Sequence, residues 1–151
     1  MRKINIVFIL LLMLAFTSCS QHLSRDQAEE AIINELKNAA IPVEWLEPEP
    51  GMPEWGLAHL SSIDMVDAQQ IDKFDDKKKS CSVKARVKGT VTVGAAIYGT
   101  YTKPLDHVIW FDVSPYIAYT AKGKKQTKWS ATFNYQKSGV KPKVQINPLP
   151  F

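Results

Sequence analysis

The side chains best suited to acid–base chemistry are few and far apart in this sequence. His59 and His107 are widely separated, and neither lies in the HxH or HExxH spacing of a metal-binding motif. Asp106 directly precedes His107 and is the nearest approach to an acid–base pair, but adjacent residues of a strand point to opposite faces. We therefore expect no catalytic residue, and we interpret both histidines as partly buried residues of a sheet.

Other catalytic and ligand-binding patterns are missing as well. The chain contains no GxSxG nucleophile motif, no glycine-rich phosphate loop and no CxxC pair. Several aspartates lie close enough in sequence to suggest calcium, but they lack the glycine and the terminal glutamate of a calcium-binding loop. We expect them to form solvated acidic surface: Asp64, Asp67, Asp72, Asp75 and Asp76. The sequence therefore predicts no enzyme, no metal site and no cofactor.

The amino-terminal segment carries chemistry of another kind. Met1-Arg2-Lys3 is positively charged, and residues 4–16 are apolar except for one asparagine. As a helix this apolar run would rise about 20 Å, which is short of the ~30 Å hydrocarbon core of a bilayer. A positive start, a short apolar run and then small residues are typical of a secretory signal peptide. The small residues are followed at once by a cysteine, in the order Thr17-Ser18-Cys19-Ser20.

This segment resembles the signal peptides of bacterial lipoproteins, although Phe16 stands where Leu, Val or Ile is usual. The resemblance implies a diacylglyceryl thioether on Cys19, cleavage before it and acylation of the new amino terminus, which together anchor a chain firmly in a membrane. Ser20 after the cysteine implies the outer membrane, facing the periplasm, rather than the inner membrane. The alternative is an ordinary secretory signal that is cut after Ser20.

On the lipoprotein interpretation the chain divides into three parts. Residues 1–18 are the signal peptide, residues 19–23 are the lipidated cysteine and a tether, and residues 24–151 form a single α+β domain. Cys81 then has no intramolecular partner, and we expect a small, half-buried residue protected by packing. The alternative is a reactive thiol or an intermolecular disulfide, favoured by the lysines at positions 77–79.

The first secondary-structure element expected after the tether is a helix. Ser24 and Gln27 have the spacing of a capping box, and acidic residues follow in the first turns. Apolar residues then recur at steps of four and three: Ala28, Ile32, Leu36 and Ala39. This pattern predicts an amphipathic helix that ends before Ile41-Pro42, because the α-helical backbone conformation is disfavoured for a residue that precedes proline.

Residues 41–55 differ in composition from the segment before them, since they contain four prolines and four glutamates. This composition predicts an extended loop with a turn near Pro50-Gly51. Trp45 and Trp55 lie among the acids, so the loop is a candidate partner-binding loop. The alternative is that both indoles cap the open end of the core. Residues 57–76 fit either a short helix or a strand.

From Ser80 onward the hydrophobic period becomes two. Val83, Ala85, Val87, Val91 and Val93 alternate with basic residues and threonines, and Gly89 suggests a bulge or bend. Further strands are expected over residues 107–113, 116–121 and 127–135, with a hairpin connection at 122–125 and a short edge strand near Val144 and Ile146.

The fold class predicted from this order is α+β, with the amino-terminal amphipathic helix packed on an antiparallel, curved β-meander of four to five strands. A sheet with one polar face needs cover on its other face, and the helix is the available cover. The element order alone resembles the cystatin-like and NTF2-like architectures. Such an analogy carries no function.

Charge is distributed unevenly along the chain. Residues 19–76 contain thirteen acids and three bases, whereas residues 77–151 contain fourteen bases and two acids. Alternation in a strand aligns three of the bases on one face, and others cluster before this strand and at the hairpin. The candidate sites for an anion or a partner are Lys77, Lys78, Lys79, Lys84, Arg86, Lys88, Lys122, Lys124, Lys125 and Lys128. The alternative is that the acidic half packs beside these bases and cancels their charge.

We expect an envelope lipoprotein that acts as a non-catalytic binding module, such as an accessory subunit, an inhibitor or an immunity-type factor. Its partners would be the membrane, through Cys19, and an envelope protein or an anionic envelope polymer. Nucleic acid is not expected, because the export signal places the chain where nucleic acid is normally absent. The alternative function is a small-ligand carrier or hydrolase that uses the concave face of the sheet. A carrier would need a pocket walled by Trp110, Phe111, Tyr119, Trp129 and Phe133.

Overall fold

The computed structural model describes residues 22–46, 57–95 and 99–139. Within these ranges the chain forms one α-helix, a short 3-10 helix and five strands. Their bounds are α2 (Arg25–Leu36), β1 (Ala40–Pro42), η1 (Val43–Trp45), β2 (Leu57–Ile71), β3 (Cys81–Ala95), β4 (Gly99–Tyr119) and β5 (Lys125–Phe133). None of the helical residues described here belongs to a helix that is long and apolar enough to cross a membrane.

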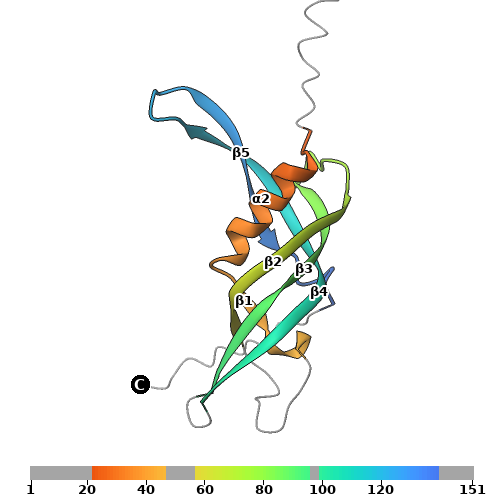
Figure 1. The fold of residues 1–151 in the computed structure, drawn as a ribbon. Helices are drawn as coiled ribbons and strands as arrows, with labels where there is room; N and C mark the ends of the chain where they lie inside the picture. Colours follow the sequence, from red (N-terminus) through yellow and green to blue (C-terminus); the bar gives the residue numbers. More distant parts are fainter. Residues whose placement is uncertain (1–21, 47–56, 96–98, 140–151) are drawn as a thin grey trace, which may run out of the picture.

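The five strands form one antiparallel sheet in the order β1-β2-β3-β4-β5, so each strand pairs with its neighbour in the chain. Helix α2 contacts both β2 and β5, which are not adjacent strands, because the sheet curves around it (Figure 1). The predicted α+β class, with a curved antiparallel meander of four to five strands, is confirmed at this level.

The helix begins as predicted. The hydroxyl of Ser24 accepts a hydrogen bond from the backbone N–H of Gln27 at 3.2 Å, and the Gln27 side chain accepts one from the backbone N–H of Ser24 at 3.0 Å. The helix ends at Leu36, so Ala39 lies outside it. Residues 37–39 turn the chain from the helix into β1, whose first residue, Ala40, pairs with His59 of β2.

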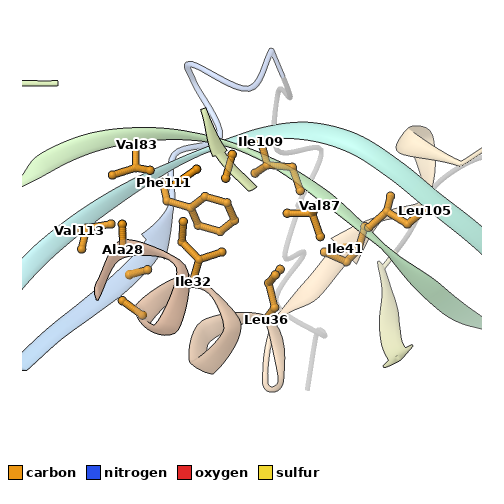
Figure 2. Close-up of a cluster of buried hydrophobic side chains, with 14 of the residues drawn as sticks. Ala28, Ile32, Leu36, Ile41, Val83, Val87, Leu105, Ile109, Phe111 and Val113 are labelled. Carbon is orange, nitrogen blue, oxygen red and sulfur yellow. The ribbon is translucent and has the colours of Figure 1, made fainter. Parts of the chain in front are cut away.

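The core lies between α2 and the concave face of the sheet. Ala28, Ile32 and Leu36 point from the helix toward apolar side chains of the strands, among them Val87 and Phe111 (Figure 2). These five side chains are fully buried. Burying one large aliphatic side chain contributes roughly 1.5–3 kcal/mol, so this contact holds the helix on the sheet.

Residues 57–71 are a strand, which decides between the two structures that their sequence allowed. Three register shifts in β2 each insert one extra residue opposite β3, between Leu60 and Ser62, between Ile63 and Met65, and between Ala68 and Gln70. These bulges turn the period of two into steps of three at some positions, so Ile63 and Val66 both pack against the core. The helix-like spacing is therefore the signature of a bulged strand.

The bulge expected at Gly89 lies in the neighbouring strand. Strand β3 keeps an unbroken register with β4 through Gly89, which pairs with Leu105. On its other side, Gly89 pairs with Ile63 at a β2 bulge. A Cβ atom on Gly89 would lie 2.2 Å from the backbone oxygen of Ser62. Glycine is needed here because the two backbones approach closely.

The two strands expected at 107–113 and 116–121 are one continuous strand, β4. Pro115 does not interrupt it, because β3 pairs with β4 only as far as Val113 and leaves one side of β4 open beyond that residue. Proline, which lacks a backbone N–H, is tolerated where a strand has an unpaired side. Pro115 pairs with Trp129 of β5 on the other side.

Part of the predicted loop at 41–55 is regular structure. Residues Ala40–Pro42 form the edge strand β1, where a proline is acceptable, and Val43–Trp45 form the 3-10 helix η1. Other predictions lie outside the described residues, namely the signal peptide and Cys19, Trp55, and the edge strand near Val144 and Ile146.

Candidate interaction surface

The acid and the histidine of the Asp106-His107 pair lie on opposite faces of β4. The Asp106 carboxylate accepts hydrogen bonds from Arg86 on the outer face, which hold its pKa below the usual range. His107 faces the inner side and stacks on Trp45, with ring centroids 4.8 Å apart. Burial lowers the pKa of His107, although the charge of Asp106 acts in the opposite direction. The two side chains therefore do not form an acid–base pair.

Cys81 opens β3 and is 3% exposed. Burial raises the pKa of its thiol, and the charge of Asp72 acts in the same direction. The preceding residues Lys77, Lys78 and Lys79 are exposed in the turn between β2 and β3. This environment favours the packed residue over the reactive thiol, because a thiol reacts as its thiolate.

The aspartates near residues 64–76 are distributed over separate interactions. One oxygen of Asp75 accepts hydrogen bonds from the backbone N–H groups of Lys77 and Lys78, at 2.9 and 3.2 Å. Asp67 forms an ion pair with Arg25, and Asp72 forms one with Lys137. In the part of the chain that the structure describes, no three His, Cys, Asp or Glu side chains converge to hold a metal ion.

The five aromatic residues named for a carrier pocket do not line a common cavity. Phe111 is fully buried in the core, and Trp129 and Phe133 pack against that core. Trp110 lies on the opposite face of the sheet, beneath Lys137, and Tyr119 is 67% exposed. The core under α2 is filled by side chains at these positions.

A groove of about 1290 Å³ lies at one end of the molecule. It is bounded by the start of α2, by the β2–β3 turn and by Pro115 of β4. Its lining residues are His22, Leu23, Ser24, Arg25, Ile71, Asp72, Lys73, Phe74, Asp76, Lys79, Cys81 and Pro115. Three segments that are distant in sequence therefore meet at this end of the fold.

The predicted basic residues of β3 form an outer stripe, which we define as Lys84, Arg86 and Lys88. Arg86 donates to both oxygens of Asp106, at 2.8 and 2.9 Å, and Lys88 lies 3.5 Å from the same carboxylate. Lys84 lies over the ring of Trp110, 6.0 Å from its centroid. The outer stripe is thus neutralised in part by its neighbour strand.

The second predicted cluster lies on a hairpin arm, which we define as residues 114–130. Here β4 and β5 pair with each other from Ser114 and Ser130 to Tyr119 and Lys125, without β3. Figure 1 shows this two-stranded ribbon projecting from the body of the sheet. Its turn is held by hydrogen bonds between Thr120 and Lys124, and Gly123 adopts a positive φ of 75°.

The arm presents bases and large apolar side chains together. Lys122, Lys124, Lys125 and Lys128 are exposed, and the arm has no acidic residue. Among the described residues, none of the four lies within 4.0 Å of a carboxylate. Tyr116, Ile117 and Tyr119 are 47%, 56% and 67% exposed. This combination of free charge and exposed apolar surface is typical of a contact surface.

Sequence reasoning identified the lysines of the arm but not its apolar residues. The signal was present, because Tyr116, Ile117 and Tyr119 stand close to a lysine-rich turn and no acid follows them before residue 130. Trp45, the candidate of the acidic loop, stacks on His107 and lies 6.3 Å from Phe133 between ring centroids. Its contacts favour the alternative in which the indole caps the core.

We compared the chain with protein families, curated proteins and solved structures. No family model matches the chain, and no curated protein or solved structure matches it significantly.

Proposed function

We propose that this chain is an envelope lipoprotein, anchored through Cys19, whose domain is a non-catalytic binding module. Its hairpin arm binds an anionic component of the envelope. The single observation that carries the proposal is the arm itself. Its four exposed lysines, none of which lies within 4.0 Å of a carboxylate among the described residues, share a two-stranded ribbon with the exposed side chains of Tyr116, Ile117 and Tyr119. The lipobox-like signal supports the location in the envelope.

The composition of the arm suits an anionic surface. Each lysine near such a surface contributes about 1 kcal/mol, so four lysines together would bind at moderate salt. Tyrosine adds a large apolar ring and a hydroxyl that remains solvated, and for this reason it is common at contact surfaces. The filled core beneath α2 also supports binding at the surface rather than inside the sheet.

The test compares two pairs of lysines in the full chain, purified in detergent. One variant carries Lys124→Gln and Lys125→Gln in the arm, and the matched control carries Lys84→Gln and Lys88→Gln in the outer stripe. The probe is dextran sulfate, an immobilised polyanion, and the measurement is the salt concentration that elutes each protein.

We expect the arm variant to elute at clearly lower salt than the wild type, and the control to elute close to it. Unpaired charges are available to a polyanion, whereas Lys88 already lies beside Asp106 and Lys84 lies over the ring of Trp110. Equal losses in the two variants would contradict the proposal, because they would show that only total charge matters.

A further inference from the structure

The arm lies at the same end of the molecule as the exit point of the amino-terminal tether. Leu23, the residue before the helix cap, is 4% exposed and belongs to the core, so the tether leaves the folded domain at a fixed place. Leu23 and Pro115, at the base of the arm, line the same groove. In Figure 1 the start of α2 and the tip of the arm both lie toward the top of the view.

Chain length limits how far this end can lie from a lipid attached to Cys19. The four peptide steps from Cys19 to Leu23 span at most about 14 Å, even when fully extended. The arm from Pro115 to Ala121 has six steps of about 3.3 Å, so it reaches about 20 Å from its base. A lipid anchor on Cys19 would therefore hold the base of the arm within reach of the bilayer surface.

The β2–β3 turn at the same end carries both signs of charge. Lys73 and Lys79 line the groove together with Asp72 and Asp76, and Lys77 and Lys78 lie exposed in the same turn. The outer stripe, by contrast, lies along the body of the sheet and shares its charge with Asp106. At the end where the tether begins, the arm is therefore the element that carries lysines without acidic residues of its own.

From this arrangement we infer that the hairpin arm docks on the anionic headgroups of the membrane that holds the Cys19 anchor, and so orients the domain on it. Lysines contact the headgroups, while Ile117 and Tyr119, which lie two positions apart on one face of β4, enter the boundary between headgroups and acyl chains. Tyrosine and lysine are the residues that this boundary favours. The inference rests on the proposed function and names the ligand of the same surface.

The test reports whether the tip of the arm touches the bilayer. The full lipidated chain, with Cys81→Ala to remove the buried thiol, carries Ala121→Cys labelled with the environment-sensitive dye NBD. The matched control carries Thr102→Cys, an exposed residue toward the opposite end of the same strand. Both are reconstituted into vesicles of phosphatidylcholine alone, or with about a third phosphatidylglycerol, so that the anchor inserts equally in each.

We expect NBD at position 121 to shift to the blue and to brighten about twofold only in the phosphatidylglycerol vesicles, because the headgroup boundary excludes water. The change should disappear at ~0.5 M NaCl, where the Debye length is only a few ångströms. It should also disappear with Lys124→Gln and Lys125→Gln, while the label at position 102 stays unchanged.

An unchanged label at position 121 in phosphatidylglycerol vesicles would overturn the membrane inference. If the arm variant still lost retention on dextran sulfate, the proposed function would stand and the arm would bind a different polyanion or an acidic protein. If neither measurement responded, both proposals would be wrong. A response in vesicles of phosphatidylcholine alone would also overturn the inference, because it would not depend on anionic lipid.

Discussion

The outer stripe and the hairpin arm are both basic, yet they differ in what surrounds each charge. Arg86 and Lys88 share the carboxylate of Asp106, which β4 places directly beside them. In the arm, β4 and β5 supply no acid, and the described residues bring no carboxylate within 4.0 Å of its lysines. Strand register, rather than the density of lysine in the sequence, therefore decides which positive charges remain available.

The same two regions differ in what covers their apolar residues. Phe111 and Tyr119 lie on the same strand, but one is fully buried and the other is 67% exposed. Around Phe111 the strand has β3 on one side and β5 on the other, whereas β3 no longer pairs beyond Val113. The body of the sheet is built for stability, and the arm leaves its side chains accessible.

The largest effect on stability is expected when Phe111→Ala is compared with Tyr119→Ala. Removing the buried ring, which also contacts Phe133 at 5.0 Å between centroids, should lower the free energy of unfolding by about 3–5 kcal/mol. Removing the exposed ring should change it by less than about 0.5 kcal/mol. Urea unfolding measures both. A similar loss in the two variants would show that the arm belongs to the stable body.

A smaller loss is expected for Gly89→Ala in the body. The new methyl group would collide with the Ser62 backbone oxygen, and the backbones must separate, at a cost of about 2 kcal/mol. Gly94→Ala in the same strand is the control, because among the described residues no atom beyond its chain neighbours lies within 4 Å of its Cβ position. If thermal unfolding gave equal midpoints for both variants, the close approach of β2 and β3 would be refuted.

The next prediction concerns Glu29, which joins helix α2 to strand β2 through its bond to Ala68. Glu29→Ala tests how much its hydrogen bonds contribute to the free energy of unfolding. Glu29 accepts hydrogen bonds from Arg25 at 2.8 Å and from the backbone N–H of Ala68 at 3.0 Å, so its removal should cost about 1–2 kcal/mol. Glu30→Ala, at the exposed neighbouring position, should cost less than about 0.5 kcal/mol. Chemical denaturation at pH 7 compares the two variants.

The contribution of Glu29 should also depend on pH. Burial raises the pKa of Glu29, but the bonds to Arg25 and to the Ala68 N–H outweigh it and lower the pKa overall. Its stabilisation is therefore present above the unfolded pKa of about 4.5 and is lost as the pH falls through the lower folded pKa. A gap between wild type and Glu29→Ala that persisted at pH 2 would contradict this assignment.

The smallest effect concerns His107 beneath Trp45. Burial lowers its pKa, so the unfolded chain binds a proton more readily than the folded chain does. Stability should therefore fall slightly as the pH decreases from 7 through about 6.5 toward the folded pKa. His107→Phe removes this group, so its urea midpoint should lose that dependence between pH 7 and 5.5. An unchanged dependence would assign the titration to another residue.

Sequence reasoning succeeded where the signal is local. The capping box at Ser24 and Gln27 depends on residues three positions apart, and the alternation in β3 depends on neighbours two positions apart. It was ambiguous for β2, because three bulges replace the simple period with steps that also fit a helix. It divided β4 at Pro115, because the missing neighbour that makes this proline acceptable comes from another strand.

The candidate surface divides in the same way. The hairpin and its lysines follow from a glycine in a lysine-rich turn between two alternating segments, which a reader of the sequence can recognise. The neutralisation of the outer stripe cannot be recognised from the sequence, because Arg86 and Asp106 meet only through the pairing of β3 with β4. The exposure of Tyr119 cannot be recognised either, because it depends on where β3 stops pairing with β4.

The sequence by itself determined the helix, the alternating strands, the hairpin turn and the uneven charge, because each depends on residues a few positions apart. Only the tertiary structure decided which of the described lysines lie beside a carboxylate, which aromatic rings lie outside the core, and that Leu23 and Pro115 meet at one end of the fold. The physical reason is that charge pairing and burial depend on distance in space. That distance is set by strand register and by the curvature of the sheet around α2.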